Sequence, residues 1–92
     1  PTSLHQVLSA DPRAWAEART AARPGDQILL VGDGVALLLA PPDDGLDGAL
    51  ALAVDVAARG LVDAGEHAGV ECIDDAAWVA LVAEHAHVLS WS

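Results

Sequence analysis

The 92-residue chain has 14 acidic residues against 4 arginines and no lysine, which gives a formal net charge of −10. A chain of this length is expected to form one domain, residues 1–92. Its acidic surface would repel a polyanion, so direct nucleic-acid binding is not expected. Hydrophobic residues make up 53% of the chain and are mainly Ala, Leu and Val, without Phe, Tyr or Met, which predicts a core of small aliphatic side chains.

Two sequence features bear on the cellular location. The single cysteine, Cys72, cannot form an internal disulfide, so nothing indicates an oxidising compartment. The first residues lack a basic segment followed by an apolar stretch. No apolar run approaches the roughly 20 residues that span a bilayer, and Val35 to Ala40 stops at Pro41. We therefore expect a cytoplasmic protein with no signal peptide and no membrane helix.

The first predicted elements are a strand and a helix. Ser3 to Leu8 is expected to form a short strand. Asp11 and Pro12 then indicate a helix start, because Asp is a favoured N-cap and Pro is tolerated at the first helical position. The helix is predicted from about Pro12 to Arg23, with an apolar face made of Trp15, Ala18 and Ala22.

The middle of the chain contains two continuous apolar runs, Gln27 to Val31 and Leu50 to Val54. Continuous rather than alternating apolar residues are typical of strands that helices cover on both faces. Between them, Val35 to Ala40 is predicted to form a short helix, and Pro41 to Gly48 is predicted to be a loop.

The last part of the chain repeats the alternation of helix and strand. Val56 to Gly60 is predicted to form a short helical turn and Val70 to Ile73 a fourth strand. Asp74-Asp75 is expected to cap a helix from about Ala76 to Ala86, and Val88 to Trp91 to add an edge strand. The apolar stripe of this helix comprises Trp78, Leu81, Val82 and His85.

Strands that alternate with helices at short intervals indicate βα units and parallel pairing. The predicted fold is α/β, a small three-layer sandwich with a mostly parallel sheet of about 4–5 strands and helices on both faces.

Three aspartates, Asp33, Asp55 and Asp74, follow predicted strands and would therefore gather at the carboxyl edge of the sheet. They could bind a divalent metal, or each could cap the helix that follows it. Capping is favoured because it explains all three positions without a cofactor. Gly32-Asp33-Gly34 lacks the third glycine of a dinucleotide-binding motif and the lysine of a P-loop, so we predict a tight turn there.

His85 and His87 form a His-x-His pair, with Glu84 and His67 as further candidate zinc ligands. On a helix, however, His85 falls within the apolar stripe and His87 lies roughly opposite. We therefore favour a packed His85 near the helix C-terminus, where the helix dipole favours a proton donor.

Cys72 is the only candidate for persulfide or nucleophilic chemistry. A reactive cysteine needs a lowered pKa and access for its partner. Here Glu71 and Asp74 lie close by, and acidic neighbours raise the pKa of a thiol. We therefore favour an inert, packed thiol.

Five motifs, in order from end to end of the chain, together resemble those of the TusB/DsrH family. They are Leu4-His5-x-Val7; Gly25-Asp26-x-x-Leu29-Leu30-x-x-Asp33-Gly34-Val35; Asp55-Val56-Ala57-Ala58-Arg59-Gly60-Leu61; Gly69-Val70-Glu71-x-Ile73-Asp74; and Leu81-Val82-x-Glu84-His85-x-x-Val88-x-Ser90-Trp91.

The resemblance implies a DsrE/F/H-like subunit that assembles with TusC-like and TusD-like homologues into a heterohexamer. In the TusB branch the complex relays persulfide sulfur toward 2-thiolation of the tRNA wobble uridine. In the DsrH branch it serves sulfur oxidation. DsrH-type members carry a cysteine in the first helix, whereas this chain has no thiol between Ala14 and Ala22 and has Ala18 near the expected position.

The resemblance and the missing thiol together imply a structural, non-catalytic TusB-like subunit of a cytoplasmic sulfurtransferase complex for tRNA 2-thiolation, with no catalytic residue, cofactor or metal of its own. Three alternatives stay open: a DsrH-like component of a sulfur-oxidation complex, a persulfide carrier that uses Cys72, and a protein that self-associates in isolation without TusC-like or TusD-like partners. The segment Val35 to Ala40 is expected to contribute to a partner interface, because Val35, Leu37, Leu38 and Leu39 are too apolar all round for a solvent-facing helix.

Overall fold

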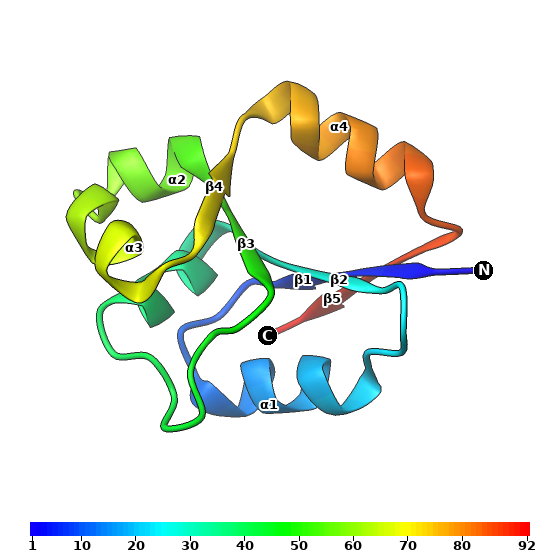
Figure 1. The fold of residues 1–92 in the computed structure, drawn as a ribbon, viewed down its shortest axis with the longest axis horizontal. Coiled ribbons are helices and arrows are strands. Elements are labelled where there is room, and N and C mark those ends of the chain that lie inside the picture. Colours follow the sequence, from blue (N-terminus) through cyan, green and yellow to red (C-terminus); the bar gives the residue numbers. More distant parts are fainter.

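The computed structural model describes residues 1–92 as a five-stranded sheet with helices on both faces (Figure 1). The strands are β1 (Ser3–Val7), β2 (Gln27–Leu30), β3 (Ala49–Leu52), β4 (Glu71–Ile73) and β5 (His87–Trp91). The helices are α1 (Pro12–Ala21), the 3₁₀ helix η1 (Gly32–Leu38), α2 (Ala53–Ala58), α3 (Val62–Ala68) and α4 (Asp75–Glu84).

The sheet has the strand order β4-β3-β2-β1-β5, and every neighbouring pair is parallel. The first four strands follow one another across the sheet. Helix α4 then returns the chain from the β4 edge to the opposite edge, where β5 pairs with β1 and Leu4 lies opposite Val88. Helices α1 and α4 cover opposite faces (Figure 1). The predicted three-layer α/β sandwich is confirmed, with a sheet that is parallel throughout.

Each face of the sheet has its own apolar core. The larger core lies on the α1 side and includes Val7, Trp15, Leu30, Val35, Leu38 and Val56. The smaller core lies on the α4 side and consists of Leu4, Leu29, Val31, Leu52, Ile73 and Leu81. Consecutive residues of β2, Leu29 and Leu30, are both fully buried because they point into different cores. This explains the continuous apolar run in the sequence.

Capping residues define the starts of the two longest helices. The side chain of Asp11 accepts a hydrogen bond from the backbone N–H of Arg13, and Pro12 is the first residue of α1. Asp74 Oδ1 accepts from the N–H of Ala77, 2.8 Å away, at the start of α4. Both helices were predicted within two residues of their observed bounds. In α4, however, Leu81 is the only buried residue, and Val82 is 42% exposed.

The short helix predicted at Val35 to Ala40 is present as the 3₁₀ helix η1, which begins three residues earlier and ends at Leu38. The prediction that this segment contributes to a partner interface is wrong, because Val35, Leu37 and Leu38 are buried within the chain's own core. They are covered because η1 contacts β2, β3, α2 and α3. Only Leu39, which is 68% exposed, remains available to a partner. Apolar residues on all sides of this segment therefore indicate internal burial rather than a binding surface.

The tight turn predicted at Gly32-Asp33-Gly34 is instead the first turn of the 3₁₀ helix η1, and it lies against the end of β1. The N–H of Val31 donates to the carbonyl of Val7 at 3.1 Å. A Cβ atom at Gly34 would collide with this same carbonyl oxygen. The glycine is therefore required by the close approach of two backbone segments.

Candidate functional site

Three residues from separate motifs form a hydrogen-bonded network on the α1 side of the sheet. His5, in β1, is 1% exposed, and its Nε2 lies 2.9 Å from Asp26 Oδ2. Trp91 Nε1 donates to His5 Nδ1 at 3.1 Å. An indole nitrogen only donates, so Nδ1 must be the acceptor and the ring proton resides on Nε2, which donates to Asp26. His5 is therefore neutral, with its tautomer fixed by both neighbours.

The carboxylate of Asp26 accepts three hydrogen bonds. Besides His5, the backbone N–H groups of Ser3 and Arg23 donate to it at 2.8 and 3.1 Å. These bonds, led by that from His5, lower the pKa of Asp26 from 3.8 to about 2. Hydrogen bonds to a carboxylate favour its charged form. The group therefore stays ionised and links β1 to the turn before β2.

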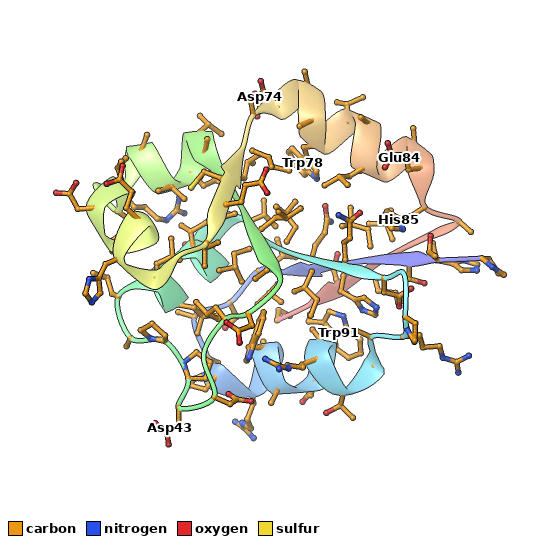
Figure 2. The ribbon with its side chains drawn as sticks, viewed as in Figure 1. Asp43, Asp74, Trp78, Glu84, His85 and Trp91 are labelled. Atoms are coloured by element: carbon orange, nitrogen blue, oxygen red, sulfur yellow. The ribbon has the colours of Figure 1, made fainter.

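The network has the composition of a catalytic dyad but not its geometry. A histidine that acts as a general base directs one nitrogen to a carboxylate and leaves the other for substrate. Here Trp91 occupies the second nitrogen of His5, and its ring stacks on that of His5 with centroids 6.0 Å apart. Figure 2 shows Trp91 between the sheet and α1. The network therefore holds β5 against β1 and leaves no nitrogen for proton transfer.

A second set of polar contacts links α4 to the other face of the sheet, away from α1. His85 Nδ1 lies 2.8 Å from Thr2 Oγ1, and His85 Nε2 lies 2.8 Å from Gln27 Oε1. Trp78 Nε1 donates to Gln6 Oε1 at 2.9 Å. His85 follows the last residue of α4 and is half-buried, as the packed interpretation requires.

The structure does not assemble the zinc ligands considered from the sequence. His87 points to the α1 side of the sheet, where it lines a cavity with His5 and Trp91, whereas His85 contacts the α4 side. His67 lies in the last turn of α3. No group of three or more His, Cys, Asp or Glu side chains is arranged to hold a metal ion.

The aspartates at the carboxyl edge form a pair and a separate cap. Arg59 Nη2 lies 3.0 Å from Asp33 Oδ1, and Arg59 Nη1 lies 3.8 Å from Asp55 Oδ1. Asp55 Oδ2 also accepts from the N–H of Gly32 at 2.7 Å. Asp74 only caps α4. Two of the carboxylates are thus bridged by the chain's own arginine.

The capping interpretation is therefore right for Asp74 and wrong for Asp33 and Asp55. Helix α2 begins at Ala53, directly after β3, so Asp55 already lies within its first turn. Its side chain reaches across to η1 instead of capping its own helix. Asp33 is likewise inside η1, which makes no side-chain capping bond.

Cys72 lies on the edge strand β4 and is exposed, so the prediction of a packed thiol is wrong. The residue as a whole is exposed, and Ile73 is the single buried residue of the strand. The Cys72 side chain nevertheless lines a pocket with Val62 and Glu66 of α3, so its sulfur is partly covered. This partial burial raises the pKa of Cys72, and the nearby carboxylate of Glu66 raises it further. A raised pKa keeps the thiol protonated and weakly nucleophilic at neutral pH.

The position expected for the missing family thiol faces the interior. Ala18 is fully buried on the inner side of α1, in the larger core. The exposed side of the helix carries Ala16, Glu17 and Arg19. A thiol at position 18 would thus be enclosed in this chain.

A scan against models of protein families matches the model described as "DsrH like protein" over residues 12–88. The chain belongs to the DsrH-like family. It is therefore a sulfur-relay subunit of the TusB/DsrH type, and proteins of this family act within multi-subunit sulfur-relay complexes. No curated protein matches the chain. None of its helices combines the length and the apolar character needed to cross a bilayer.

The His5–Asp26–Trp91 network was missed by sequence reasoning, although each member lies in one of the motifs that resemble the family. His5 and Asp26 belong to the first two motifs, and Trp91 ends the last. The available signal was a histidine, an aspartate and a tryptophan at motif positions next to predicted strands. In this DsrH-like chain those motif residues hold the fold together.

Proposed function

We propose that this chain is a structural subunit of a cytoplasmic complex that relays persulfide sulfur toward 2-thiolation of the tRNA wobble uridine. Its partners are a TusC-like and a TusD-like subunit, which with it form a heterohexamer, and one of them supplies the active cysteine. The observation that carries the proposal is that this chain has no activated thiol: its only cysteine, Cys72, has a raised pKa.

The chemistry of sulfur relay explains why this observation matters. A thiolate accepts sulfur by attacking the outer sulfur of a persulfide, which breaks the donor's S–S bond and releases the donor's thiolate, so the acceptor must be deprotonated and accessible. Cys72 is accessible, but partial burial of its sulfur and the carboxylate of Glu66 disfavour its thiolate, and Glu66 would also repel an incoming persulfide anion. The buried histidine that could serve as a base, His5, has both nitrogens occupied.

The charge distribution supports a subunit that leaves tRNA contacts to its partners. The net charge is −10. Arg59, one of the four cationic side chains, is paired with Asp33 and Asp55. Nucleic-acid binding depends strongly on neutralising phosphates with Lys and Arg, which this surface cannot do.

The proposal is tested by following sulfur from a cysteine desulfurase and radiolabelled cysteine into the assembled complex. We expect label on a partner subunit, none that is stable on this chain, and the same tRNA thiolation rate when Cys72→Ser replaces the wild type. Stable label on the wild-type chain that Cys72→Ser abolishes would overturn the structural role and establish a persulfide carrier.

The tRNA branch is tested separately from the sulfur-oxidation branch. Deletion of the gene should abolish 2-thiouridine in tRNA, measured by mass spectrometry of nucleosides, and the wild-type gene should restore it. Unchanged 2-thiouridine, together with neighbouring genes for dissimilatory sulfite reductase, would favour a role in sulfur oxidation instead. Purification from the native cell without two homologous subunits would favour the self-associating alternative.

A further inference from the structure

The outer face of α4 is apolar along almost its whole length. Val79 is 68% exposed, Val82 is 42% exposed, and the alanines at positions 76, 80 and 83 are also exposed. The only polar side chains in the helix are the terminal Asp75 and Glu84, apart from the indole N–H of Trp78, which points from α4 toward the sheet (Figure 2). A surface helix normally has polar residues on its outer side. The outer face of α4 therefore lacks the side chains that suit contact with water.

A groove of about 290 Å³ lies between α4 and the sheet. Its apolar lining includes Leu50, Ile73 and Leu81. Two carboxylates also line it, Glu71 from β4 and Glu84 from the last turn of α4. Neither glutamate forms a salt bridge within the chain. The groove thus combines an apolar lining with two unpaired negative charges.

Charge on this side of the molecule is entirely negative. Asp74 and Asp75 add to the two glutamates, and Figure 2 shows Asp74 and Glu84 at opposite ends of α4. The cationic side chains lie elsewhere. Arg13 and Arg19 are on α1, across the sheet; Arg23 lines a cavity on that same side with His5 and Trp91; and Arg59 is already paired. A second copy of this chain placed on the same surface would bring like charges together, which disfavours a homodimer through α4.

We propose that the outer face of α4 and this groove form the docking surface for a partner subunit that presents apolar side chains and a lysine or arginine. The aliphatic part of the basic side chain packs on Leu50, Ile73 and Leu81, and its charged end pairs with Glu71 and Glu84. The inference rests on the proposed function, because the partner is one of the two homologous subunits of the relay complex.

The decisive experiment compares two substitutions at equally exposed positions. Val79 on α4 and Leu39 after η1 are both 68% exposed, so Val79→Asp and Leu39→Asp introduce the same charge without disturbing either core. Binding of each variant to co-expressed TusC-like and TusD-like subunits is measured by co-purification and by titration. We expect at least a tenfold loss of affinity for Val79→Asp and less than about a twofold change for Leu39→Asp. Far-UV circular dichroism confirms folding, and Ala83→Asp replaces Val79→Asp if that variant does not fold.

The charged part of the surface is tested by the double substitution Glu71→Gln, Glu84→Gln. Exposed ion pairs weaken as salt rises, because the Debye length falls from about 10 Å at 0.1 M to about 3 Å at 1 M. We expect wild-type affinity to fall as salt is raised over this range and the affinity of the double variant to change less. If salt lowered the affinity of both proteins equally, the proposal that a basic side chain of the partner pairs with Glu71 and Glu84 would be wrong.

The outcomes separate this inference from the proposed function. Failure of the wild-type chain to bind either homologous subunit would overturn both. A complex that forms with the wild type and equally well with Val79→Asp would overturn the α4 surface alone. Loss of binding with Leu39→Asp instead would place the interface near the end of η1. If the wild type forms a homodimer and Val79→Asp dissociates it, the occupant of the α4 surface is a second copy of this chain and the proposal of a different partner subunit is wrong.

Discussion

Replacing Trp91 with phenylalanine tests whether the His5–Asp26–Trp91 network stabilises the fold. Trp91→Phe keeps an aromatic ring but removes the N–H that binds His5 Nδ1. That nitrogen is then left without a donor on a side chain that is 1% exposed. Leaving a buried polar atom unsatisfied costs about 1–3 kcal/mol. In a domain of this size each kcal/mol shifts Tm by about 4–8 °C, so a loss of about 2 kcal/mol lowers Tm by about 8–16 °C.

The other two tryptophans provide matched controls with the same substitution. Trp78→Phe removes a hydrogen bond to Gln6, but Gln6 is half-buried and can bind water instead, so we expect a loss of about 0.5–1 kcal/mol. Trp15 Nε1 is buried without a partner, so Trp15→Phe loses packing but no hydrogen bond. Urea unfolding should be followed by far-UV circular dichroism, because these three residues are the fluorophores.

The reasoning predicts that Trp91→Phe is the most destabilising of the three. A loss no greater than that of Trp78→Phe would show that His5 does not depend on the indole donor. Nitrogen NMR of His5 gives an independent check. The wild type should show the tautomer protonated at Nε2, and a mixture of tautomers at neutral pH would refute the assignment.

Three further predictions concern other parts of the structure. Because folding lowers the pKa of Asp26 from 3.8 to about 2, the stabilising effect of its charged form is complete above about pH 4 and is lost as pH falls toward 2. The difference in stability between the wild type and Asp26→Asn, measured from urea midpoints, should therefore shrink from about pH 4 to about pH 2 and stay constant above about pH 4. Gly34→Ala should prevent folding or strongly lower the urea midpoint, because its Cβ collides with the backbone of Val7. Gly65→Ala, whose Cβ would make ordinary contacts with Leu38 and Cys72, should instead raise stability by about 0.5–1 kcal/mol, and equal effects would contradict the structure. Cys72 should react with iodoacetamide more slowly than free cysteine at pH 7, and Glu66→Gln should speed the reaction; an unchanged rate would exclude the carboxylate as a cause.

Local features of the sequence predicted most of the architecture. The apolar runs predicted the strands, and Asp11 and Asp74 marked the helix starts, because these signals act over a few residues. Helix α3 was not predicted, since it is short and Gly65 lowers helix propensity. The structure shows that Gly65 lies close to the side chains of Leu38 and Cys72.

Features that depend on distant parts of the chain were not predictable from the sequence. His5 binds partners 21 and 86 residues away, and no local pattern specifies such a pairing. The apolar residues of η1 and the apolar outer face of α4 are similar in composition. The first are enclosed and the second are exposed because α2 and α3 cover η1, whereas nothing in the chain covers α4. Composition alone could not distinguish these two environments.

The pairing of β5 with β1 also sets the order in which the protein can fold. Each of β2, β3 and β4 pairs with the strand before it, so these contacts form early as the chain is synthesised. Val88 must return to Leu4, and this closure of a long loop is slow. Without the pairing of residues 87–91, one side of β1 would be an open strand edge and His5 would lack its indole donor. We therefore expect closure of the last strand onto the first to limit the folding rate.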